Sequence, residues 1–180
     1  MHSAKMYFLA IVAPAQINEQ VLKWKHYMRE HYGCTVALKS PAHITLVPPF
    51  WMDISLEKNL MNDVDAFAAQ QHKFEISLKN FDAFKPRVIF VGIEDNDELR
   101  ELKLALENYL HLTYPIKKET RPFHPHLTIA NRDLRKKDFA PAFEHFNRIE
   151  YEVSFPAAGI SLLRHNGTEW DVHHISVFNN

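Results

Sequence analysis

Apolar residues recur along the chain with two different periods, and these periods predict the secondary structure of its first half. Short apolar runs rich in β-branched and aromatic residues predict strands, whereas apolar residues spaced three or four positions apart predict helices. Such segments occur in the order strand, helix, strand, helix, strand: Tyr7–Val12, Ile17–Tyr32, a strand around His43, Ser55–Gln70 and Phe74–Leu78. The first half is therefore predicted to be a β-α-β-α-β unit.

The second half repeats this order at nearly the same spacing. Its predicted elements are a strand at Arg87–Ile93, a helix at Asp97–Leu112, a strand around His126, a helix around Leu134–Phe146 and a strand at Tyr151–Phe155. The separation from Phe8 to His43 and that from Phe90 to His126 differ by one residue. Such self-similarity indicates an internal duplication. We predict one domain over residues 1–180, with halves at roughly 1–83 and 84–180.

Two further strands are predicted after the duplicated region. They are Gly159–Arg164 and Asp171–Phe178, and the Asn166-Gly167 dipeptide between them is typical of a hairpin turn. Ser55 and Asp97 each precede an apolar periodic run and are predicted as helix N-caps. The pattern as a whole predicts an α/β (α+β) fold with two lobes. We expect two small antiparallel or mixed sheets, one per half, that face a central groove with helices outside.

Each half carries one copy of the pattern His-x-Thr-x on a predicted strand. The copies are His43-Ile44-Thr45-Leu46 and His126-Leu127-Thr128-Ile129. Because successive side chains of a strand point to opposite faces, the histidine and threonine of each copy share one face, while the apolar residues share the other. Two such strands that face each other would place two imidazoles across one cleft. Two imidazoles so placed can act as a general acid and a general base near neutral pH.

Such a pair suits in-line displacement at a phosphodiester. The reaction needs a base to remove a proton from water and an acid to protonate the departing oxygen, on opposite sides of phosphorus. One histidine on each side of a groove supplies both groups. The threonine hydroxyls can donate hydrogen bonds to the non-bridging oxygens, where charge grows in the transition state. The sequence leaves open which histidine is the base.

Residues beside the motifs are candidate substrate contacts. Arg132 follows His126 by six residues and is predicted to reach a phosphate, with a solvated loop arginine as the alternative. His124 lies on the same strand face as His126 and is a candidate for the mouth of the cleft. Phe50 and Phe123 flank the two motifs and could stack on a base, or else pack in the core or at its rim.

Composition excludes several classes of protein. The formal net charge of −1 argues against broad electrostatic coating of nucleic acid. The cluster Arg132, Arg135, Lys136 and Lys137 could steer an anionic substrate, or else form the solvated start of a helix. No apolar run approaches membrane-spanning length and the first residues do not form a signal peptide, so we expect no membrane association and a cytoplasmic location. Cys34 is the only cysteine and excludes an internal disulfide.

The chain contains twelve histidines, which raises the alternative of a metal site. The spacing argues against it, because there is no HExxH motif and His26 and His31 miss the i, i+4 spacing of helical ligands. His173 and His174 are adjacent and would point to opposite faces of a strand. The four glycines form no phosphate-binding or dinucleotide-binding loop. The sequence therefore predicts no metal and no cofactor.

The duplicated motif, in halves of this size and order, resembles the two-histidine (2H) phosphoesterase superfamily, which includes 2'-5' RNA ligase-like proteins and RNA cyclic phosphodiesterases. The resemblance covers nearly the whole chain. It implies a bilobal α/β fold, no metal, and action on 2',3'-cyclic phosphates or 2'-5'-linked ends of RNA or small nucleotides. It also implies that His43, Thr45, His126 and Thr128 form the active site.

The resemblance leads us to expect a metal-independent enzyme that hydrolyses, or reversibly ligates, such ends. We expect RNA ends or small cyclic nucleotides as its ligands, no stable protein partner, and a monomer. One alternative is a non-catalytic RNA-binding or nucleotide-binding protein of the same fold. A metal-dependent hydrolase built from the surplus histidines is the other.

Overall fold

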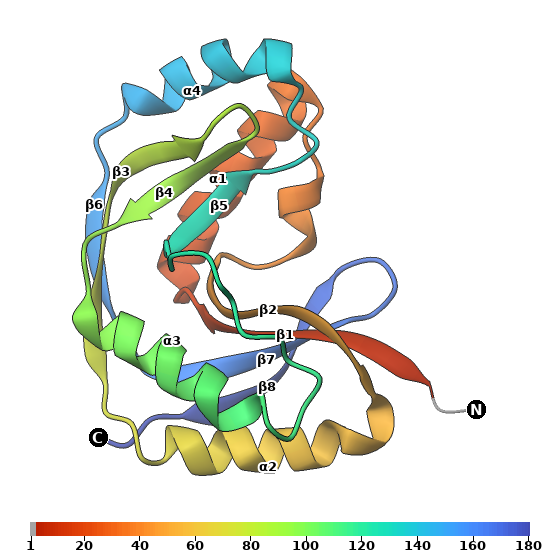
Figure 1. The fold of residues 1–180 in the computed structure, drawn as a ribbon. Helices are drawn as coiled ribbons and strands as arrows, with labels where there is room; N and C mark the ends of the chain where they lie inside the picture. The colour runs from red at the N-terminus through yellow and green to blue at the C-terminus, as the bar shows by residue number, and fades with distance from the viewer. Residues whose placement is uncertain (1–2) are drawn as a thin grey trace.

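Two four-stranded sheets form the centre of the computed structural model, which describes residues 3–180 (Figure 1). The strands of the first sheet are β1 (Ala4–Val12), β2 (His43–Asp53), β7 (Gly159–His165) and β8 (Trp170–Val177). Those of the second are β3 (Phe74–Phe84), β4 (Val88–Ile93), β5 (His126–Ala130) and β6 (Glu152–Ala157). Their spatial orders are β2-β1-β7-β8 and β5-β4-β3-β6, and every pair of neighbours is antiparallel. The fold is the expected α+β class, with antiparallel sheets.

Two helices pack against each sheet. The α-helices within residues 3–180 are α1 (Ala15–Tyr32), α2 (Glu57–Ala68), α3 (Asp97–Leu110) and α4 (Phe139–Asn147). The short 3-10 helices are η1 (Val36–Lys39), η2 (Ile54–Leu56) and η3 (Lys136–Asp138). The α1 helix contacts β5 and α4 contacts β3, while α2 contacts β7 and β8 and α3 contacts β2. Figure 1 accordingly shows α2 and α3 at one end of the molecule and α4 at the other.

The sheets do not coincide with the duplicated halves of the chain. The β3 strand, which ends the first half, lies between β4 and β6 in the second sheet, and the C-terminal strands β7 and β8 complete the first sheet beside β1. The expectation of one sheet per half is therefore wrong. Hydrophobic periodicity reports which faces of a strand are buried but not which strand lies next to it. The boundary between the halves stays a prediction.

The predicted helix starts are displaced by a few residues. Asn96 caps α3, because its Oδ1 accepts a hydrogen bond from the backbone N–H of Leu99 at 2.8 Å, so Asp97 is the first helical residue and not the cap. Ser55 lies inside η2, where its backbone N–H donates to the Asp53 carboxylate at 2.9 Å. The helix predicted from Leu134 also begins later, after a turn and η3. In each case a short capping or 3-10 segment precedes the regular helix.

One cluster of buried apolar side chains joins both sheets and all four helices. It includes the apolar residues of both motifs, since Ile44, Leu46, Leu127 and Ile129 are fully buried. The predicted alternation along β2 and β5 is thereby confirmed: one face of each strand belongs to the core, which leaves the other face for the histidine and threonine. No helix among residues 3–180 is both long enough and apolar enough to cross a membrane.

Candidate active site

The two motif strands meet at a groove between the lobes. The β2 and β5 strands are edge strands of their sheets, and they contact each other. A groove of about 490 Å³ lies there, and its walls include His43, Thr45, His126 and Thr128. The structure thus brings together the four side chains that the duplicated motif singled out.

The two imidazoles are oriented by the same local contact. The Nδ1 atom of His43 lies 2.7 Å from the carbonyl oxygen of Pro41, and that of His126 lies 2.7 Å from the carbonyl oxygen of His124. A carbonyl oxygen can only accept a hydrogen bond, so Nδ1 carries the proton in each ring. In the neutral imidazole this leaves Nε2 as the free nitrogen with a lone pair.

Each imidazole also packs against a buried phenylalanine from the neighbouring strand. The ring centroids of His43 and Phe8 are 4.8 Å apart, and those of His126 and Phe90 are 4.9 Å apart. Phe84 adds an edge-on contact with His126 at 5.1 Å. A planar ring held on one side by an aromatic side chain and at Nδ1 by the backbone has little freedom to rotate. Both histidines are therefore positioned before any ligand binds.

The surroundings favour the neutral form of both histidines. The pKa of His43 is lowered to about 4, mainly by burial; the hydrogen bond to Pro41 opposes this effect, and the charges of Lys25 and His126 add to it. Burial is likewise the main cause that lowers the pKa of His126. At neutral pH an empty groove therefore presents two uncharged imidazoles. An anionic phosphate between them would raise both pKa values, because it stabilises the imidazolium form.

The other predicted contacts are distributed unevenly around the groove. Arg132 lies on its wall, in the loop after β5, and its side chain is exposed. His124 and Phe123 line an adjoining hollow of about 620 Å³ that also touches Thr45 and His126. Phe50 is not on the groove wall. It is buried in the core beside Tyr7, with ring centroids 6.1 Å apart.

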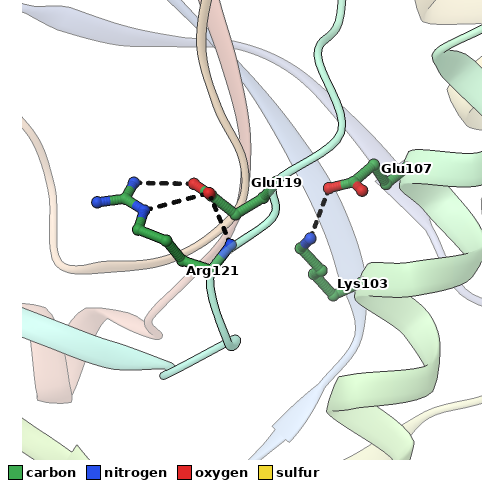
Figure 2. A network of polar contacts seen from close by, with 4 residues as sticks. All are labelled: Lys103, Glu107, Glu119 and Arg121. Atoms are coloured by element: carbon green, nitrogen blue, oxygen red, sulfur yellow. Dashed lines mark hydrogen bonds and ion pairs between the residues drawn. The ribbon is translucent and has the colours of Figure 1, made fainter.

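Two ion pairs lie beside the adjoining hollow (Figure 2). On α3 the buried ammonium of Lys103 donates to the Glu107 carboxylate at 2.5 Å. On the segment before β5, Arg121 donates to the Glu119 carboxylate at 2.8 Å. The charges of this hollow are thus largely neutralised within the protein.

Several groove residues were missed by the sequence analysis. They are Phe8, Lys25, Lys39, His165 and Trp170. The ring of Trp170 packs edge-on against that of Phe8 at 4.6 Å, so the C-terminal hairpin supports the histidine side of the first lobe. For Lys25 the sequence did hold a signal, because a lysine occupies the apolar face of a helix.

His173 and His174 each contact a different carboxylate. The Nε2 atom of His173 lies 2.9 Å from the Glu57 carboxylate, and that of His174 lies 2.7 Å from the Asp65 carboxylate. In the part of the chain that the structure describes, no three His, Cys, Asp or Glu side chains converge so that they could hold a metal ion.

Two lobes, each built on an antiparallel sheet, present one His-x-Thr strand each to a common groove. This is the architecture of the 2H phosphoesterases. The family model described as the 2'-5' RNA ligase superfamily matches residues 13–169. The chain therefore belongs to the 2'-5' RNA ligase superfamily.

Individual proteins resemble the chain in sequence or in fold. The chain is 26% identical over 171 residues to "Putative phosphoesterase GWCH70_0799" of Geobacillus sp. (strain WCH70), with 93% of this chain and 92% of that protein covered. Its fold is similar to that of E. coli LigT complexed with 3'-AMP, with a TM-score of 0.74 at 21% identity over 99% of this chain and 100% of that chain. TT0787 of Thermus thermophilus gives a TM-score of 0.70 at 19% identity over 96% and 97% of the two chains.

Proposed function

We propose that this protein is a metal-independent phosphoesterase that hydrolyses, or reversibly ligates, 2',3'-cyclic phosphates or 2'-5'-linked ends of RNA or small nucleotides. The observation that carries the proposal is the matched pair of histidines, each anchored at Nδ1 by the backbone and each accompanied by a threonine on the wall of one groove. Membership of the superfamily supports it. So do the E. coli LigT structures with 3'-AMP, ATP and NADP+, which make a nucleotide the natural first ligand to test.

In the hydrolytic direction, Nε2 of the basic histidine removes a proton from a water molecule, and the water oxygen attacks phosphorus. The bond between phosphorus and the ribose oxygen on the far side breaks, and Nε2–H of the other histidine donates its proton to that oxygen. Thr45 and Thr128 donate hydrogen bonds to the non-bridging oxygens. The product is an acyclic phosphate monoester. After this step the basic histidine carries one proton more than before, and the acidic histidine carries one proton fewer.

The unequal surroundings of the two histidines suggest their roles. His43 is held neutral more strongly, since its pKa is lowered to about 4 and Lys25 adds to the effect of burial. The pKa of His126 is also lowered, but Lys25 is not among the causes, so we propose that His126 is the ring that takes up a proton when an anionic phosphate binds. We assign His43 as the base and His126 as the acid in hydrolysis. In ligation the roles exchange, because each step is the reverse of the other.

The remaining contacts divide between phosphate and base. Arg132, an exposed guanidinium on the groove wall, is the proposed phosphate contact. Phe123 and His124 line the adjoining hollow, where a base attached to the reacting ribose could stack. Phe50 is left out of the proposed site because it is buried in the core.

A substrate screen tests this function. Purified protein is incubated with each 2',3'-cyclic mononucleotide and with RNA ends that carry a cyclic phosphate, in the presence of a chelator, and the product phosphate is assigned to the 2' or 3' position by NMR. Turnover that persists under chelation is the expected result. Binding without turnover would identify the non-catalytic alternative, and turnover restored only by a divalent ion would identify the metal-dependent one.

A further inference from the structure

Lys25 is a buried cation on the wall of the catalytic groove. Its side chain comes from the apolar face of α1 and is only 3% exposed, yet it lines the same groove as His43 and His126. The Nζ atom donates one hydrogen bond, to the carbonyl oxygen of Ser40 at 2.9 Å. An ammonium carries three N–H donors. Within residues 3–180 no carboxylate forms an ion pair with it.

In the second half, the residue that corresponds to Lys25 belongs to an ion pair. The offset in sequence from Phe8 to Phe90 equals the offset from the first residue of α1 to the first residue of α3, and the same offset leads from Lys25 to Glu107. Glu107 accepts a hydrogen bond from the buried Lys103 one helical turn away (Figure 2). A buried charge without a counter-ion is costly. The first half thus keeps an unneutralised ammonium where the second half has an internal ion pair.

The two lobes also differ after their motifs. Arg132 follows His126 by six residues, whereas Pro49 occupies the equivalent position after His43, and both line the groove. The first lobe therefore has a proline inside β2 where the second lobe has an arginine in the loop after β5. Its buried cation at the groove comes instead from α1.

Lys25 and His43 influence each other electrostatically. Burial lowers the pKa of Lys25 to about 8, so most of the population is still an ammonium at neutral pH. This charge is one of the causes that lower the pKa of His43. The other charged or titratable side chains on the groove wall are Lys39, His126, Arg132 and His165.

We propose that Lys25 is an anion-binding residue of the groove: its free N–H groups donate hydrogen bonds to phosphate oxygens of the ligand, which supplies the counter-ion that the protein lacks. The inference rests on the proposed function for the identity of the anion as a phosphate ester. In the empty groove the same ammonium acts on His43 as a positioning charge that keeps the imidazole neutral.

Sulfate is a suitable first probe, because it remains a dianion across the neutral range and needs no turnover. Affinity for sulfate is measured by calorimetry at pH 7 for the wild type, Lys25→Met, Lys25→Arg and the matched control Lys23→Met, an exposed lysine on the same helix. Loss of one charged hydrogen-bonding partner should weaken binding about tenfold or more in Lys25→Met. Lys25→Arg should retain most of the affinity, and Lys23→Met all of it. Equal affinity of Lys25→Met and the wild type would overturn the proposal.

A second readout separates this role from a purely structural one. Removal of the ammonium should raise the pKa of His43 in the ligand-free protein, as followed by NMR of the imidazole resonances, and Lys25→Arg should leave it near the wild-type value. If Lys25→Met does not fold, Lys25→Gln provides the same neutralisation. A His43 pKa that stays unchanged in a folded neutral variant would contradict the positioning role.

Substrates with different numbers of phosphates show which phosphate Lys25 contacts. An equal loss of kcat/KM in Lys25→Met on a 2',3'-cyclic mononucleotide and on a dinucleotide with a terminal cyclic phosphate indicates the reacting phosphate. A loss confined to the dinucleotide indicates the adjacent phosphodiester, and no loss on either contradicts the proposal. Sulfate binding through Lys25 in a protein that turns over none of these substrates would instead overturn the proposed function and preserve the anion site.

Discussion

His43 and His126 are held by the same contact, a hydrogen bond from Nδ1–H to the carbonyl oxygen two residues earlier in the chain. Neither ring depends on a carboxylate for its orientation, unlike a histidine in a Ser-His-Asp triad. Each motif therefore fixes the tautomer of its own histidine with its own backbone. A substitution elsewhere on the groove wall should change the charge around the rings without changing which nitrogen is free.

Replacement of either histidine should abolish most of the activity. A general acid or base contributes about 10² to 10⁴ in rate, so His43→Ala and His126→Ala should each lower kcat on the best cyclic phosphate by at least about 100-fold. Thr45→Ala and Thr128→Ala should cost less, roughly tenfold each. The exposed His72, remote from the motifs in sequence, provides the control His72→Ala. Near wild-type turnover in either groove variant would exclude the paired acid and base.

The low pKa of His43 predicts sensitivity to acid. The folded protein binds a proton at His43 only near pH 4, whereas the unfolded chain binds it near pH 6.5. Stability should therefore be complete above about pH 6.5 and fall as the pH drops toward 4, with a loss of about 2 kcal/mol at pH 5 from this residue. Urea unfolding at pH 7.5 and pH 5 measures it, and His43→Ala should lose less stability than the wild type over that interval. An equal loss in both proteins would assign the acid sensitivity to other groups.

Arg132→Ala should weaken nucleotide binding and reduce its dependence on salt. The side chain is exposed on the groove wall, so its removal should leave the melting temperature nearly unchanged. Titrations at two ionic strengths, with Arg29→Ala as an exposed arginine control, separate a lost phosphate contact from a general change in charge. Unaltered affinity together with a lowered melting temperature would remove Arg132 from the site.

The phenylalanines behind the histidines should affect turnover more than binding. Phe8→Leu and Phe90→Leu should each destabilise the fold by about 1 to 2 kcal/mol. They should also lower kcat with little change in KM, because the imidazoles lose a wall that orients them. Phe155→Leu, at a buried position of β6, should cost similar stability and leave kcat unchanged. Equal kcat in all three variants would show that ring packing does not orient the histidines.

The sequence identified the parts of the site that depend on local pattern. Alternation along β2 and β5 placed the histidines and threonines on the face opposite the apolar residues, and the duplication brought the two motifs into one hypothesis. The alternation does not extend to Phe50: Val47 is buried although it has the parity of Thr45, and the pairing of β2 with β1 shifts register between Thr45 and Phe50. The burial of Phe50 beside Tyr7 therefore could not be read from its position relative to the motif.

Features set by tertiary neighbours were beyond the sequence. The placement of β3 in the second sheet and the support of Phe8 by Trp170 both depend on pairing between distant segments. Periodicity describes a single element and carries no information on which surface covers it. Lys25 was recognisable as a charge on an apolar helix face, but only the groove shows why it is there.

Each lobe contains strands from both halves of the chain, because β3 lies in the second sheet and β7 and β8 lie in the first. The chain passes from the first sheet to the second between α2 and β3 and returns between β6 and β7, where Ala157 and Gly159 are separated by one residue. The main cluster of buried side chains also spans both sheets, so we expect the two walls of the groove to move together and not like domains on a flexible hinge. The distance between the two imidazoles is then set when the chain folds. A phosphate that enters the groove meets a preformed site, so its binding does not incur the entropy loss of a closing motion.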